Sequence, residues 1–139
     1  GLPWHQDAAF FGGSFAAVNV WAALSPCGPQ EGGLTLVPAK IADVVGDLDP
    51  FIDESGSLAF DYGRSVFTES IIDHLCEGRE PETPQMDPGD VLLFDEMAVH
   101  RTHCTALTPG RREVATTWFF SPDRVPRKSF DGPWEPLVV

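Results

Sequence analysis

Residues 88–100 read Pro-Gly-Asp-Val-Leu-Leu-Phe-Asp-Glu-Met-Ala-Val-His, which is a turn, a short apolar run and an exit into a histidine. Pro-Gly-Asp is a turn signal, because proline presets φ, glycine accepts positive φ and aspartate bonds its own backbone. The apolar run at 91–94 is too short for a helix and is bounded by breakers, which predicts a buried strand. The segment therefore predicts a β-fold that delivers His100 just beyond a strand.

Three other segments are expected to be strands. Residues 15–24 and 113–120 combine β-branched and aromatic residues next to turn signals. Residues 34–37 form a short apolar run that ends at Pro38, because proline cannot donate to a strand ladder. A stretch rich in glycine and proline joins 15–24 to 34–37, so we expect these two strands to form an antiparallel pair.

One helix is expected over residues 65–76. Its apolar residues recur at helical spacing, Ser65 can cap its first turn, and Gly78 follows its end. Residues 39–64 are less regular, and residues 79–90 are rich in breakers and predict a loop. Strands without βαβ alternation predict an all-β core with a minor helix, arranged as a barrel or a double-sheet jelly roll.

The length of 139 residues suits one domain with one core, so residues 1–139 are taken as a single domain. Four strands do not close a jelly roll, and the chain begins at Gly1 without a methionine and already inside motif-like sequence. We therefore expect an N-terminally incomplete fold, a C-terminal catalytic portion whose remaining strands lie upstream.

The composition narrows the classes of partner. The formal charge is −12, with 21 acidic and 9 basic residues, which disfavours nucleic acid because phosphate binding needs a basic face. The apolar runs are far shorter than the roughly 18–20 residues that span a bilayer. Cys27, Cys76 and Cys104 have neither the even number of a disulfide framework nor the spacing of a zinc site. We therefore expect reduced thiols in a cytoplasmic protein that acts on a small molecule.

Two histidines and one acid form a candidate metal-binding set. His5 and Asp7 lie two residues apart, so on a strand their side chains would point to the same face. His100 adds a second imidazole, and two histidines with one carboxylate are the facial set of non-haem Fe(II) oxygenases. Arg111, eleven residues after His100, has the planar guanidinium that pairs with a carboxylate. On a strand Arg112 would point to the opposite face, so only one of the two arginines should serve.

Six short motifs follow one another along the chain: His5-Gln-Asp, Val20-Trp-Ala-Ala-Leu, Gly32-Gly-Leu-Thr-Leu-Val-Pro, Pro88-Gly-Asp-Val-Leu-Leu-Phe, His100-Arg-Thr and Arg111. In this order, and with this interval between the last histidine and the arginine, they resemble the phytanoyl-CoA dioxygenase-like family. The resemblance covers residues 4–120, nearly all of the chain. Each motif is loose by itself, but the ordered set is specific.

The resemblance implies a double-stranded β-helix, a relative of the jelly roll and of cupins. It also implies an Fe(II)- and 2-oxoglutarate-dependent dioxygenase that hydroxylates a small organic or acyl substrate and releases succinate and CO2. His5, Asp7 and His100 would bind the iron. O2 would be the second cosubstrate, with ascorbate as an accessory reductant. The presence of Asp7 argues against a halogenase, because halogenases of this class lack the carboxylate.

For the cosubstrate, the resemblance implies that Arg111 holds the distal carboxylate of 2-oxoglutarate with help from Thr102, and that Trp21 lines the pocket. The chain departs from the family where Ala39-Lys40-Ile41 follows Pro38. The family often has Gly-Ser-His there, near the substrate entrance, so the substrate is not defined.

Two rival interpretations stay open. A cupin-like metal enzyme that does not use 2-oxoglutarate would keep the three metal ligands and would not need Arg111. A non-catalytic binding domain would keep the scaffold alone. The intact set of metal ligands and arginine argues against the second, because a site that no longer works usually loses at least one of its residues.

Overall fold

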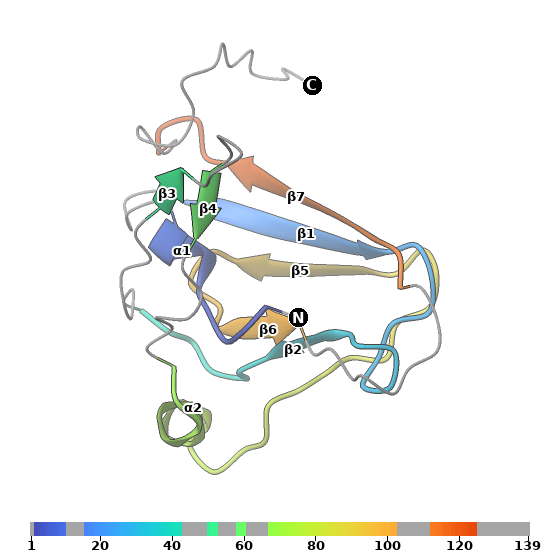
Figure 1. Cartoon of the computed structure of the whole chain (residues 1–139), viewed down its shortest axis with the longest axis horizontal. Coiled ribbons are helices and arrows are strands. Elements are labelled where there is room, and N and C mark those ends of the chain that lie inside the picture. Colours follow the sequence, from blue (N-terminus) through green and yellow to red (C-terminus); the bar gives the residue numbers. More distant parts are fainter. Residues whose placement is uncertain are drawn as a thin grey trace.

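The computed structural model describes residues 2–10, 16–42, 50–52, 58–60, 67–102 and 112–124 (Figure 1). The elements in these ranges are α1 (Asp7–Phe10), β1 (Ala17–Ala23), β2 (Leu34–Leu36), β3 (Pro50–Ile52), β4 (Leu58–Phe60), α2 (Glu69–Cys76), β5 (Val91–Asp95), β6 (His100–Thr102) and β7 (Val114–Phe120). The chain is thus mostly strand with little helix, as predicted. The bounds of β1, β2, β5 and β7 lie within two residues of those of predicted segments.

The strands form separate antiparallel sheets. β1 lies between β5 and β7 in a three-stranded sheet, β2 pairs with β6, and β3 pairs with β4 (Figure 1). The predicted pairing of residues 15–24 with 34–37 is therefore wrong. Both edges of β1 already carry ladders, since Val18 lies opposite Asp95 on one side and opposite Phe119 on the other. β1 consequently has no free edge for β2.

The hydrophobic core lies between the β5–β1–β7 sheet and the β2–β6 sheet. Side chains alternate along β1, so that Asn19 and Trp21 are buried on one face while Val18 is exposed on the other. A cluster of buried residues on the inner face joins both sheets: Trp21, Ala23, Cys27, Leu34, Met86 and Phe94. Burial of a large apolar side chain contributes roughly 1.5–3 kcal/mol, so this cluster holds the two sheets face to face.

β5 corrects a second expectation. Residues 91–94 were predicted to be buried throughout, but Phe94 is the buried residue of β5, whereas Val91 and Leu93 are exposed. An antiparallel sheet commonly packs only one face on the core, and the register places Leu93 beside Val20 on the other face.

α2 begins later than the sequence predicted. Its N-cap is Thr68, whose side chain accepts a hydrogen bond from the backbone N–H of Ile71. The predicted cap Ser65, which lies outside the described residues, is therefore not the residue before the helix. Glu77 and Gly78 have positive φ and end the helix. The inner side of α2 packs in a second core cluster: Trp4, Val37, Phe67, Ile72, Cys76 and Val99.

The hairpin of β3 and β4 lies in the region that the sequence analysis left without regular structure. Its strands pair from Pro50 opposite Phe60 to Ile52 opposite Leu58. Three residues are too few for an alternation pattern, and Pro50 at the start of β3 argues against a strand, so these strands were missed. In the part of the chain that the structure describes, no helix has the length and apolar character needed to cross a membrane.

Candidate metal centre

A two-way backbone bridge brings the N-terminal segment to β6. The N–H of His5 donates to the carbonyl of His100, and the N–H of His100 donates to the carbonyl of His5, each over 2.9 Å. The two imidazole centroids consequently lie 4.2 Å apart. The ring of Phe94 meets the ring of His100 edge-on, with centroids 4.8 Å apart, which packs that histidine in place.

Asp7 reaches the same point as the first residue of α1. The expectation that His5 and Asp7 share one face of a strand is wrong, because His5 makes only an isolated bridge and the chain turns helical at Asp7. The turn is held by Gln6, whose fully buried side-chain amide donates to the carbonyl of Met97 over 2.8 Å. The residues just before His100 thereby position the Asp7 carboxylate next to the His100 imidazole.

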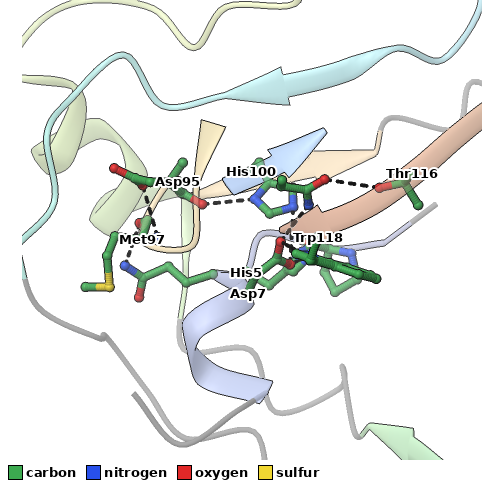
Figure 2. A network of polar contacts seen from close by, with 11 residues as sticks. His5, Asp7, Asp95, Met97, His100, Thr116 and Trp118 are labelled. Atoms are coloured by element: carbon green, nitrogen blue, oxygen red, sulfur yellow. Dashed lines mark hydrogen bonds and ion pairs between the residues drawn. The ribbon is translucent and has the colours of Figure 1, made fainter. Parts of the chain in front are cut away.

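The three predicted ligands converge (Figure 2). Asp7 Oδ1 lies 3.8 Å from His5 Nε2 and 3.7 Å from His100 Nε2, and all three side chains are buried. One ligand atom from each residue lies within 4.8 Å of the other two. Bonds of about 2.1 Å to one ion allow two ligand atoms to be at most about 4.2 Å apart. Both nitrogen–oxygen pairs therefore lie within reach of a single metal ion.

Backbone carbonyls orient both imidazoles. His5 Nδ1 lies 2.7 Å from the carbonyl oxygen of Pro3, and His100 Nδ1 lies 2.9 Å from that of Ala98. A carbonyl only accepts, so each Nδ1 carries the proton and each Nε2 presents its lone pair toward Asp7. Burial, and after it the neighbouring His100, lower the pKa of His5 to about 4. His5 is therefore neutral at pH 7, which is the form that binds metals.

The other carboxylate oxygen of Asp7 is held by residues that the sequence analysis missed. Asn19 Nδ2 donates to Asp7 Oδ2 over 2.7 Å, and Trp118 Nε1 donates to the same oxygen over 2.8 Å. Thr116 Oγ1 in turn donates to Asn19 Oδ1 over 3.1 Å (Figure 2). One sequence signal was present, because asparagine is disfavoured in strands and Asn19 interrupts the apolar segment 15–24.

The predicted cosubstrate residues differ in what the structure shows of them. Arg111 lies outside the described residues. Thr102 is the last residue of β6, and its hydroxyl accepts a hydrogen bond from the backbone N–H of Leu2 over 2.7 Å. Because a hydroxyl also donates, Thr102 still has a donor to offer a ligand.

Trp21 is buried on the inner face of β1, two residues from Asn19. The guanidinium carbon of Arg112 lies 5.9 Å from the centroid of the Trp21 ring. Arg112 also donates to the carbonyl oxygen of Gly32, in the motif before β2. Arg112 thus contacts both the ring of Trp21 and the backbone of the turn that contains Gly32.

The family model described as phytanoyl-CoA dioxygenase (PhyH) matches residues 1–114. The chain belongs to the phytanoyl-CoA dioxygenase family. This confirms the resemblance inferred from the motifs, and the matched range contains all three converging ligands. No curated protein and no solved structure gives a significant match to the chain.

The phytanoyl-CoA dioxygenase family is a family of oxygenases that generally depend on Fe(II) and 2-oxoglutarate. The donor set fits that metal. Two imidazole nitrogens and one carboxylate oxygen form the arrangement that non-haem Fe(II) oxygenases use, in which part of the metal's coordination sphere stays open. Cys27 and Cys76, the free thiols of the described residues, are not part of this group.

Proposed function

We propose that the protein is an Fe(II)- and 2-oxoglutarate-dependent dioxygenase that hydroxylates a small organic or acyl substrate. The observation that carries the proposal is the convergence of His5, Asp7 and His100 from segments far apart in the chain. The two facing sheets support a double-stranded β-helix as the fold of the whole domain, with the metal centre between its sheets.

His5 and His100 would bind iron through Nε2, since their Nδ1 atoms face carbonyls, and Asp7 would bind through Oδ1. Bound iron, with 2-oxoglutarate and O2, supplies an oxidant able to hydroxylate a C–H bond while the cosubstrate becomes succinate and CO2. The protein holds the ligands in position, keeps them out of water and orients the cosubstrate.

We further propose that Arg111 binds the distal carboxylate of 2-oxoglutarate, with the hydroxyl of Thr102 as a second donor. Arg112 is the less suitable of the two arginines, because its guanidinium already donates to the carbonyl of Gly32. Trp21 would line this pocket, since it is buried and its ring lies 5.9 Å from the guanidinium of Arg112.

The direct test adds Fe(II) and 2-oxoglutarate to the protein without oxygen and measures the visible charge-transfer band, then measures succinate after oxygen is admitted. We expect Asp7→Ala to abolish both signals, because the carboxylate is a metal ligand. Asp73→Ala, on the exposed side of α2, is the matched control and should leave both unchanged. Succinate release that persists in Asp7→Ala would contradict the assignment of the ligands.

The same assay separates the rival functions. Arg111→Leu should raise the concentration of 2-oxoglutarate needed for half-saturation by roughly 10–200-fold, because a charge-assisted bidentate contact contributes about 1.5–3 kcal/mol. Arg112→Leu should have a smaller effect. Neither rival function would show the charge-transfer band or release succinate, because neither uses 2-oxoglutarate. A larger loss in Arg112→Leu would move the cosubstrate contact to Arg112.

A further inference from the structure

We propose that Asn19 and Trp118 are positioning residues that hold Asp7 as a one-oxygen metal ligand and so keep one further coordination position free. The inference rests on the metal centre of the proposed function, and it concerns how the second oxygen of Asp7 is kept away from the ion. Neither residue belongs to the three converging ligands.

The two oxygens of the Asp7 carboxylate have different surroundings. Oδ1 faces His5 Nε2 and His100 Nε2, whereas Oδ2 accepts hydrogen bonds of 2.7 Å from Asn19 and 2.8 Å from Trp118. Hydrogen bonds to a carboxylate are stronger than those between neutral groups. Rotation of the carboxylate that brought both oxygens to the ion would stretch or break both of these bonds.

The pair is built into the sheet. Asn19 on β1 and Trp118 on β7 lie directly opposite one another in the register, so their side chains stand side by side on one face. Backbone ladders on both sides of β1 hold this strand in place. The two donors are therefore placed by the sheet, while the acceptor comes from α1.

The Asp7 carboxylate fixes the direction of the Asn19 amide. An ionised carboxylate only accepts, so Asn19 must present Nδ2 to Asp7 Oδ2. The amide oxygen then faces the other way and accepts a hydrogen bond of 3.1 Å from the hydroxyl of Thr116. The threonine thus supports the orientation in which Asn19 donates to Asp7.

The consequence concerns how many positions remain on the metal. Three one-atom ligands on one face of an octahedral ion leave three positions open, and a two-oxygen carboxylate would leave two. A cosubstrate that binds through two atoms, together with O2, needs three. Holding Asp7 Oδ2 away from the ion therefore preserves the position that O2 would take.

The test measures metal binding without turnover. Co(II) is titrated into the metal-free protein, and the relaxation of water protons by bound Mn(II) counts the water ligands. We expect Asn19→Ala to weaken Co(II) binding by roughly 10–100-fold and Trp118→Phe by roughly 10-fold, the range typical of residues that orient a metal ligand. Thr116→Val should weaken it less than Asn19→Ala, because it acts through Asn19.

The number of metal-bound waters should fall from about three in the wild type to about two in the Asn19→Ala/Trp118→Phe double variant, because the freed carboxylate would then chelate the ion. Thr117→Val is the matched control, since this neighbour of Thr116 lies on the opposite face of β7, beside Val20. It should keep wild-type affinity and the wild-type number of waters.

Thermal unfolding of the metal-free variants shows whether each one folds. If Asn19→Ala does not fold, Trp118→Phe alone decides, because it keeps an aromatic ring and Trp118 is 37% exposed. Wild-type affinity and water number in folded Trp118→Phe, or an equal loss of affinity in Thr117→Val, would overturn the inference. If wild-type protein binds metal but releases no succinate, the proposed function fails while this test still applies.

Discussion

The two faces of the β5–β1–β7 sheet carry opposite chemistry. On the inner face, Asn19 and Trp118 donate hydrogen bonds to the carboxylate of Asp7, one of the three candidate metal ligands. On the outer face, Val18, Leu93 and Phe119 are exposed, and the register places both Leu93 and Phe119 against β1. The face toward the core is thus the one that carries polar function, and the face toward solvent is largely apolar.

The difference shows what strand alternation can decide. Alternation sorts side chains into two faces, but hydrophobicity alone does not tell which face is inside. On the inner face of this sheet, some of the buried side chains are hydrogen-bonding groups that hold Asp7. These groups are stable there because their donors and acceptors are paired with one another.

The largest contrast should come from two phenylalanines of this sheet. Phe94 is 8% exposed and belongs to the core cluster, whereas Phe119 is 62% exposed on the outer face. Phe94→Ala should lower the free energy of unfolding by about 3–5 kcal/mol, because it leaves a cavity beside His100. Phe119→Ala should lower it by less than about 1 kcal/mol. Denaturant titration of the two variants measures both values.

Similar losses in the two phenylalanine variants would show that the two faces are buried alike, and the comparison would then fail. A further readout is the affinity for Co(II). It should fall in Phe94→Ala, because the ring packs on His100, and stay unchanged in Phe119→Ala.

A smaller effect is expected from making the outer face polar. Leu93→Lys should change the free energy of unfolding by no more than about 0.5 kcal/mol, because the side chain is already exposed. It should lower retention of the protein on a hydrophobic column, since it interrupts an exposed apolar patch. A loss of stability of several kcal/mol would mean that Leu93 is covered in solution.

The smallest effect concerns thiol chemistry and leaves stability unchanged. Cys27 is buried in the inner core cluster, and burial raises the pKa of its thiol. Because the thiolate is the reactive form, Cys27 in native protein at pH 8 should react with iodoacetamide at least about 10-fold more slowly than a cysteine introduced by Thr117→Cys on the outer face. Peptide mapping by mass spectrometry follows each thiol separately, and equal rates would place Cys27 in contact with solvent.

Much of the local structure could be predicted from sequence. β1, β2, β5 and β7 followed from β-branched and aromatic residues between breakers, and α2 followed from its apolar spacing. The partners of β1 could not be predicted, because pairing depends on contacts between residues far apart in the chain. β3 and β4 were missed because three residues show no alternation and Pro50, at the start of β3, argues against a strand.

The metal centre shows the same division. The types and order of His5, Asp7 and His100 identified the chemistry, since two imidazoles and a carboxylate suit Fe(II). The reason given for the position of Asp7 was wrong, because α1 and not a strand carries it. Asn19 and Trp118 were not recognised, as nothing in their spacing from Asp7 links them to it.

The sequence by itself determined four of the strands and α2, which family the motifs indicate and which three side chains can bind a metal, because these depend on residue type and short-range spacing. Only the tertiary structure decided that His5 bridges His100, that β1 lies between β5 and β7, and that one oxygen of Asp7 is held by Asn19 and Trp118. The physical reason is the distance along the chain over which each effect acts. A residue's preference for strand or helix acts within a few neighbours, whereas a metal centre needs atoms from distant segments to meet within a few ångströms.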